Sequence, residues 1–146
     1  DSERSRGLGD VYKRQDGYPK EREKFYKSIQ SSQSNLILAG DSHNSWISNL
    51  YDEEKKFIGI EIGAPSISSP NFVDAFGDMV DSIDKSFIES NEDLIWTNGK
   101  NKGYVELEIY SEYVEVKFHY VSSVKSKRYK KLDPISFKIN HNNPVI

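Results

Sequence analysis

The sequence predicts a mixed α/β protein (α+β) in which one β-sheet packs against another and helices flank the sheets. Two segments with helical periodicity are interleaved with short apolar runs, and the runs nearer the carboxyl end alternate strictly between apolar and polar residues. Of the 146 residues, 36% are hydrophobic, which is sufficient for a packed core. We therefore expect a layered fold built on a single core.

The first two elements are a helix and a buried strand. Residues 18–31 predict an amphipathic helix, because Pro19 suits a first helical turn and residues at a spacing of three to four share one face: Tyr18, Arg22, Phe25, Tyr26 and Ile29. The following run, residues 36–39, is continuously apolar and stops at Gly40. Such a run is typical of a strand that is buried on both faces.

A strand pair and a second helix follow. Residues 46–51 lead through a polar turn into residues 57–63, where three isoleucines alternate on one face. Residues 64–70 read as loop. Residues 71–90 predict one continuous helix with a single apolar stripe, formed by Phe72, Phe76, Met79, Val80, Ile83 and Phe87.

The carboxyl-terminal part predicts a hairpin and a last strand. Residues 104–121 alternate on both sides of Ser111-Glu112, which indicates an antiparallel hairpin. Residues 125–131 are a basic run, which is usually a solvated surface, and residues 135–139 read as a final strand.

The amino-terminal segment is predicted to be foreign to the fold. Residues 5–15, SRGLGDVYKRQ, resemble the translation of a transposon-type sequencing adapter over eleven consecutive residues. The alternative is a natural disordered tail. We expect residues 1–15 to be a non-native tail and residues 16–146 to be the carboxyl-terminal portion of a domain whose reading frame was truncated upstream.

Composition excludes several classes of function. The formal net charge of −3 argues against a nucleic-acid or anionic-membrane partner, which would favour a clustered basic face. No stretch reaches the roughly 18 apolar residues of a membrane span. With no cysteine, the chain contains neither a thiolate zinc site nor a thiol nucleophile.

The candidate chemistry lies directly after the buried strand. Gly40-Asp41-Ser42-His43 places a carboxylate and an imidazole on one tight turn, where α/β proteins usually hold ligands. These groups can bind a metal that activates water or holds a phosphoryl group. The alternative is an Asx-type turn with a surface histidine, and spacing alone favours neither.

Other polar residues carry weaker signals. His119 falls on the polar face of the predicted hairpin, and His141 lies in a polar tail. Ser66, Ser68 and Ser69 lack a suitably spaced histidine, so we expect their hydroxyls to satisfy backbone groups and to cap the following helix. Trp46 and Trp96 read as core or wall residues, and Glu61 as exposed.

Four motifs together resemble the alkaline phosphatase D (PhoD-like) family of the calcineurin-like metallophosphoesterases. They agree in order and spacing across roughly residues 16–121. The matching segments are residues 16–19 with Arg22 (DGYP, then R), 35–46 (NLILAGDSHNSW), 61–70 (EIGAPSISSP), and 91–96 followed by Gly103-Tyr104. Two departures are visible: Glu92-Asp93 replaces the Pro-His of an "N-P-H" element, and Ser42 replaces the usual valine.

This resemblance implies the carboxyl-terminal part of a metallophosphoesterase-type layered sheet sandwich. It implies His43 as a metal ligand and Asp41 as a second ligand or an orienter of metal-bound solvent, and so names both as catalytic. It further implies iron and calcium as cofactors, phosphate mono- or diesters as substrates, and export. The remaining ligands, and any export signal, would lie in a missing amino-terminal half of the same domain.

Two functions therefore follow from the sequence. The first is a fragment of a metal-dependent phosphoesterase, inactive alone and poorly soluble without the rest of its domain. The alternative is a small non-catalytic β-rich binding module that uses Trp46, Trp96 and the serine-rich loop (residues 64–70).

Overall fold

The computed structural model describes residues 18–30 and 35–140. The predicted tail at residues 1–15 and His141 lie outside the described residues. In chain order the elements are α2 (Pro19–Ile29), β1 (Leu36–Ala39), β2 (Ser45–Tyr51), β3 (Phe57–Gly63), α3 (Phe72–Phe76), the 3-10 helix η2 (Gly77–Met79), α4 (Val80–Ser90), β4 (Leu94–Asn98), β5 (Lys102–Ile109), β6 (Tyr113–Val121) and β7 (Ile135–Asn140).

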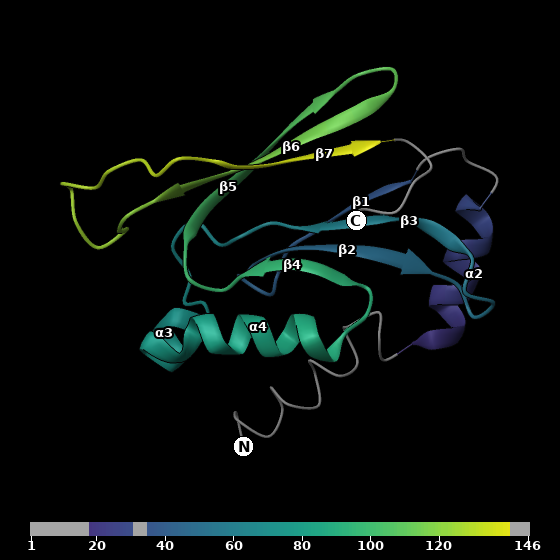
Figure 1. Cartoon of the computed structure of the whole chain (residues 1–146), viewed down its shortest axis with the longest axis horizontal. Coiled ribbons are helices and arrows are strands. Elements are labelled where there is room, and N and C mark those ends of the chain that lie inside the picture. Colours follow the sequence, from purple (N-terminus) through teal and green to yellow (C-terminus); the bar gives the residue numbers. More distant parts are fainter. Residues whose placement is uncertain (1–17, 31–34, 141–146) are drawn as a thin grey trace.

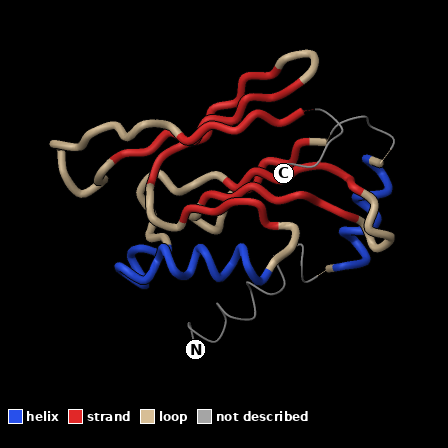
Figure 2. The backbone as a smooth tube through the Cα atoms, in the orientation of Figure 1, coloured by secondary structure: helices blue, strands red, loops and turns tan. Residues whose placement is uncertain are grey.

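These strands form two sheets. A four-stranded sheet has the order β1-β3-β2-β4, with β1 parallel to β3 and the other pairs antiparallel. A three-stranded antiparallel sheet has the order β5-β6-β7. Figure 1 shows the three-stranded sheet on one side of the four-stranded sheet and α4 on the other side, against β4. The same layers appear in the tube of Figure 2. The prediction of a mixed α/β protein with sheet packed on sheet is confirmed.

The core lies between the two sheets. Ile47, Ile60 and Ile62 of the four-stranded sheet pack against a cluster from the other sheet that includes Val116 and Phe118. The alternation in β6 is complete, because every second residue from Val114 to Tyr120 is buried. Period-two patterning therefore decided which face of each strand is buried, as the sequence indicated.

The predicted helix over residues 71–90 is wrong in its continuity. The chain forms α3, breaks at Gly77 and resumes as α4 after the 3-10 turn. Gly77 adopts φ +56°, a left-handed conformation that interrupts α-helical hydrogen bonding and is accessible to glycine at little cost. Within the predicted apolar stripe Val80 is buried, whereas Phe76, Met79 and Phe87 are exposed. Phe72 and Phe87 stack across the break, with their ring centroids 5.5 Å apart.

The strand at residues 36–39 exists, but the expectation of burial on both faces is wrong. Within the described residues, β1 pairs only with β3 and forms the edge of its sheet. The side of β1 away from β3 has no neighbouring strand there, and Leu38 is 63% exposed. The first helix also differs in detail: it ends at Ile29, and Phe25 is exposed while Tyr26 is buried.

Candidate metal centre

The turn after β1 has a strained backbone. Asp41 and His43 adopt φ +68° and +64°, in the left-handed region that side-chain-bearing residues rarely occupy. A bond of 2.8 Å from Ser42 N to Gly40 O tightens the turn, and a bond of 2.9 Å from Ala64 N to Ala39 O joins its start to the loop after β3. Non-glycine residues in this region cluster at functional sites, because the surrounding structure has to maintain them.

The His43 imidazole is held in one tautomer. Its Nδ1 lies 2.7 Å from the carbonyl oxygen of Pro70, twenty-seven residues further along the chain. A carbonyl oxygen can only accept a hydrogen bond, so Nδ1 is the protonated nitrogen of the neutral ring. Nε2 therefore keeps a free lone pair. A second partner that fixes the tautomer in this way is the usual arrangement around metal-binding histidines.

Asn44 connects this turn to the second helix. Its side chain is 1% exposed; Nδ2 donates to Ser42 O at 2.8 Å, and Oδ1 accepts from Phe72 N at 3.1 Å. The buried amide of Asn44 thus satisfies a backbone carbonyl of the turn and the backbone N–H of the first residue of α3. No local sequence pattern marks Asn44 for this role, because its partner Phe72 is distant along the chain.

We expect Asn44→Ala to destabilise the protein by about 2 kcal/mol or more, because it leaves the Phe72 N–H and the Ser42 carbonyl without their partner. The matched control is Asn91→Ala. Asn91 Nδ2 also donates to a backbone carbonyl, at 2.8 Å, but the residue is exposed. The control should change stability by no more than about 0.5 kcal/mol. Urea unfolding of both variants measures the difference, and equal losses would contradict this role.

Asp41 shares the turn with His43 but makes no hydrogen bond or ion pair with it in the described part of the chain. The residue is exposed. Among the described residues, no group of three or more His, Asp or Glu side chains gathers closely enough to hold a metal ion. The turn itself presents one imidazole nitrogen and one exposed carboxylate, two groups of the kinds that bind metals in proteins.

The serine-rich loop supports the turn through its backbone. Ser66 N donates to His43 O at 3.2 Å, and Ser66 O accepts from Gly103 N at 3.1 Å. The Ser66 hydroxyl donates to Ser69 O at 2.7 Å, as expected for a structural role. The prediction that these serines cap the next helix is wrong, because Asn71 is the N-cap residue of α3.

The other singled-out residues lie in structural roles. Trp96 packs in the core with a ring-centroid distance of 4.7 Å to Phe118, and Trp46 Nε1 donates to Glu61 Oε1 at 3.0 Å. Glu61 is therefore a partner of Trp46 and only half-exposed. His119 stacks on Tyr104 and places Nε2 2.6 Å from Glu106, on the outer face of the hairpin as predicted.

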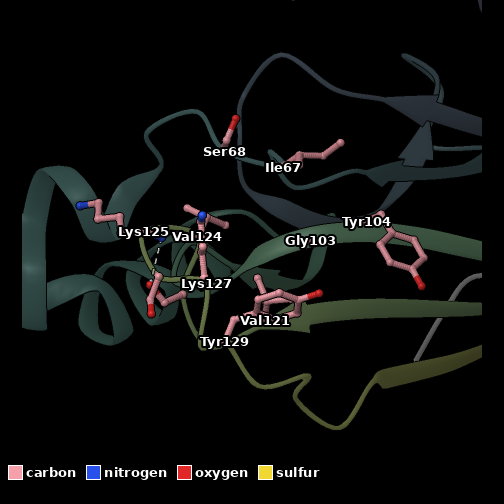
Figure 3. A pocket seen from close by; sticks show the side chains of 11 residues that line it. Ile67, Ser68, Gly103, Tyr104, Val121, Val124, Lys125, Lys127 and Tyr129 are labelled. Atoms are coloured by element: carbon pink, nitrogen blue, oxygen red, sulfur yellow. Dashed lines mark hydrogen bonds between the residues drawn. The ribbon is translucent and has the colours of Figure 1, made fainter.

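An open apolar pocket shares the serine-rich loop with this turn. It has a volume of about 550 Å³. Its lining includes Ile67 and Ser68 of the serine-rich loop, Tyr104 of β5, and Val124 and Tyr129, which follow β6 in the chain (Figure 3). The basic run at residues 125–131, predicted to be solvated surface, thus contributes part of the pocket wall through Lys125, Lys127 and Tyr129.

The fold and the turn define a class of protein: a two-sheet α/β protein with a histidine and an aspartate on a strained turn at the carboxyl end of a parallel strand, the place where α/β proteins commonly hold ligands. The family model of the PhoD-like phosphatases matches residues 3–118. The chain therefore belongs to the PhoD-like phosphatase family.

Two relatives agree with this assignment. Alkaline phosphatase D of Bacillus subtilis (strain 168) is 45% identical over 60 residues, which cover 37% of this chain and 10% of the relative. A solved structure titled "Structure of PhoD" superposes with a TM-score of 0.68 at 25% identity, covering 86% of this chain and 24% of that chain. The chain thus spans about a quarter or less of the length of either relative.

Proposed function

We propose that this chain is the carboxyl-terminal part of a metal-dependent phosphoesterase of the alkaline phosphatase D type, which hydrolyses phosphate mono- or diesters. The observation that carries the proposal is the Nδ1 contact of His43 with Pro70, at 2.7 Å, because it leaves Nε2 free to bind a metal. Membership of the PhoD-like phosphatase family supports the reaction class.

In this proposal His43 binds a metal through Nε2, and Asp41 supplies a carboxylate ligand or orients solvent. The metals, iron and calcium by family resemblance, would polarise the phosphate ester when bound. The other residues of this chain hold His43 in place. The Pro70 carbonyl orients the imidazole, Asn44 stabilises the turn, and the serine-rich loop hydrogen-bonds to the His43 backbone. A pair of metals needs several further ligands, which we assign to the amino-terminal half of the domain.

Two exposed sheet edges support the proposal of a missing half. β1 and β5 are edge strands of the two sheets among the described residues. A hollow of about 320 Å³ lies beside them, lined by Leu38 and Ala39 of β1 and by Val105 and Leu107 of β5. Unpaired strand edges with apolar side chains favour pairing with further strands. We propose that they continue into the amino-terminal part of a metallophosphoesterase-type layered sandwich.

The complete protein is proposed to be exported, by the same family resemblance. No helix among the described residues is long and apolar enough to cross a membrane.

The function is tested by reconstitution. We expect the purified 146-residue chain alone to self-associate and to show no metal-dependent hydrolysis of a chromogenic phosphate ester. Joined to the amino-terminal part recovered by extending the gene upstream, it should become monodisperse and turn over the ester with added iron and calcium. Metal-dependent turnover by the chain alone, or an inactive but correctly folded joined protein, would contradict the proposal.

A further inference from the structure

A buried lysine lies behind the loop that contacts His43. Lys102, the first residue of β5, exposes only 9% of its side chain. Its Nζ donates to Asn71 Oδ1 at 2.9 Å and forms an ion pair with Asp74 Oδ2. A buried ammonium group is tolerated only when oxygen acceptors replace its lost water, and both acceptors come from the segment that follows the serine-rich loop.

The same Asp74 oxygen also holds the peptide unit that faces His43. Asp74 Oδ2 accepts from Asn71 N at 3.2 Å. The Asn71 N–H and the Pro70 C=O belong to one planar trans peptide, so they point in opposite directions. When Asp74 fixes the direction of the N–H group, it fixes the direction of the carbonyl that accepts from His43 Nδ1. An uninterrupted series of contacts therefore runs from Lys102 to the imidazole.

The charges along this series are firmly set. Hydrogen bonding to Lys102 and to the Asn71 backbone lowers the pKa of Asp74 to about 2. A carboxylate with a depressed pKa contributes its stabilisation above its ordinary pKa, and loses it as the pH falls through the folded-state value. Asp74 is therefore charged throughout the neutral and alkaline range in which the imidazole of histidine is neutral.

We propose that Lys102 is a positioning residue for His43: with Asp74 it holds the Pro70–Asn71 peptide so that the imidazole keeps its proton on Nδ1 and its lone pair on Nε2. The consequence for metal binding rests on the proposed function, whereas the tautomer is a property of this chain. A lysine that only stabilises the fold would leave the tautomer ratio unchanged.

The test is the tautomer of His43 in the metal-free chain. Magic-angle-spinning NMR of 15N-histidine-labelled protein distinguishes protonated from unprotonated ring nitrogens regardless of particle size, and His43→Gln identifies the signals of His43. The spectra are recorded at about pH 8.5, well above the ordinary pKa of a histidine side chain. We expect Lys102→Met to lower the ratio of Nδ1–H to Nε2–H tautomer by about three- to tenfold, the effect of weakening one hydrogen bond.

Two controls accompany this variant. Lys100 lies two residues before Lys102, and its Nζ forms an exposed ion pair with Asp81 at 3.1 Å. Lys100→Met breaks this ion pair and should leave the tautomer ratio of His43 unchanged. His119, whose Nε2 contacts Glu106 at 2.6 Å, provides an internal reference that Lys102→Met should not alter. An unchanged His43 ratio in folded Lys102→Met protein overturns the proposal.

If Lys102→Met fails to fold, the double variant Lys102→Met/Asp74→Ala decides the question. Removing both charges avoids an unpaired buried ion and is far less disruptive than removing one. The double variant removes the acceptor of the Asn71 N–H, so a fall in the tautomer ratio of at least the same size is expected, and a wild-type ratio overturns the proposal. The tautomer is measured without metal, so this test does not depend on the proposed function. If the tautomer ratio depends on Lys102 but His43 binds no metal in the complete protein, the proposed function is refuted and the positioning role of Lys102 stands.

Discussion

Replacing His43 with glutamine should lower phosphoester hydrolysis by at least about 100-fold in the complete phosphoesterase that we propose, since even groups that only orient a metal ligand contribute 10- to 100-fold. Glutamine has a similar reach and is uncharged, but it has no imidazole lone pair to offer in place of Nε2. The measurement is the turnover of a chromogenic phosphate ester, with metal content determined on the same sample.

The matched control for His43→Gln is His119→Gln. His119 also contacts a polar partner, Glu106, but lies on the outer face of the hairpin. We expect His119→Gln to keep nearly full activity and metal content. Both variants should retain the thermal midpoint of the wild type to within a few degrees, the shift that accompanies about 1 kcal/mol. Activity within about threefold of wild type for His43→Gln would exclude it as a metal ligand.

Phe118→Ala should destabilise the chain by about 3–5 kcal/mol, the usual loss for a fully buried phenylalanine. Phe118 has no exposed surface, and its ring centroid lies 4.7 Å from that of Trp96 in the opposite sheet. Its removal leaves a cavity in the contact that joins the two sheets, where rigid strands on both sides prevent collapse.

The control for Phe118→Ala makes the same chemical change on the surface. Phe25 of α2 is 38% exposed, so Phe25→Ala should cost less than about 1 kcal/mol. Urea unfolding followed by tryptophan fluorescence compares the two. A loss below about 1 kcal/mol for Phe118→Ala would show that the sheets do not depend on this contact.

The strands were predictable because their signal is local. Alternation of side chains follows directly from extended backbone geometry, so the hairpin of β5 and β6 and the strands β2, β3 and β7 appear where the pattern placed them. The continuous helix over residues 71–90 failed for an equally local reason, since an apolar stripe does not reveal that Gly77 takes a positive φ.

The candidate site was predictable only in part. A motif of four residues indicated His43 and Asp41, and the resemblance across four segments raised that motif above an ordinary turn. The group that fixes the imidazole is a backbone carbonyl, which any residue possesses, so no sequence pattern marks Pro70 for this role. Lys102 likewise carries no local sequence pattern that distinguishes it from an exposed lysine.

The sequence by itself therefore determined the mixed α/β class, the positions of the strands other than β4, and the histidine that carries the proposed chemistry. Only the tertiary structure decided which nitrogen of His43 is free, which lysine is buried and which strand forms an edge. The physical reason is separation along the chain: Nδ1 of His43 meets a carbonyl twenty-seven residues away, and Lys102 meets Asn71 across thirty-one. Periodicity records the local backbone, whereas these contacts exist only after the two sheets and their loops have packed together.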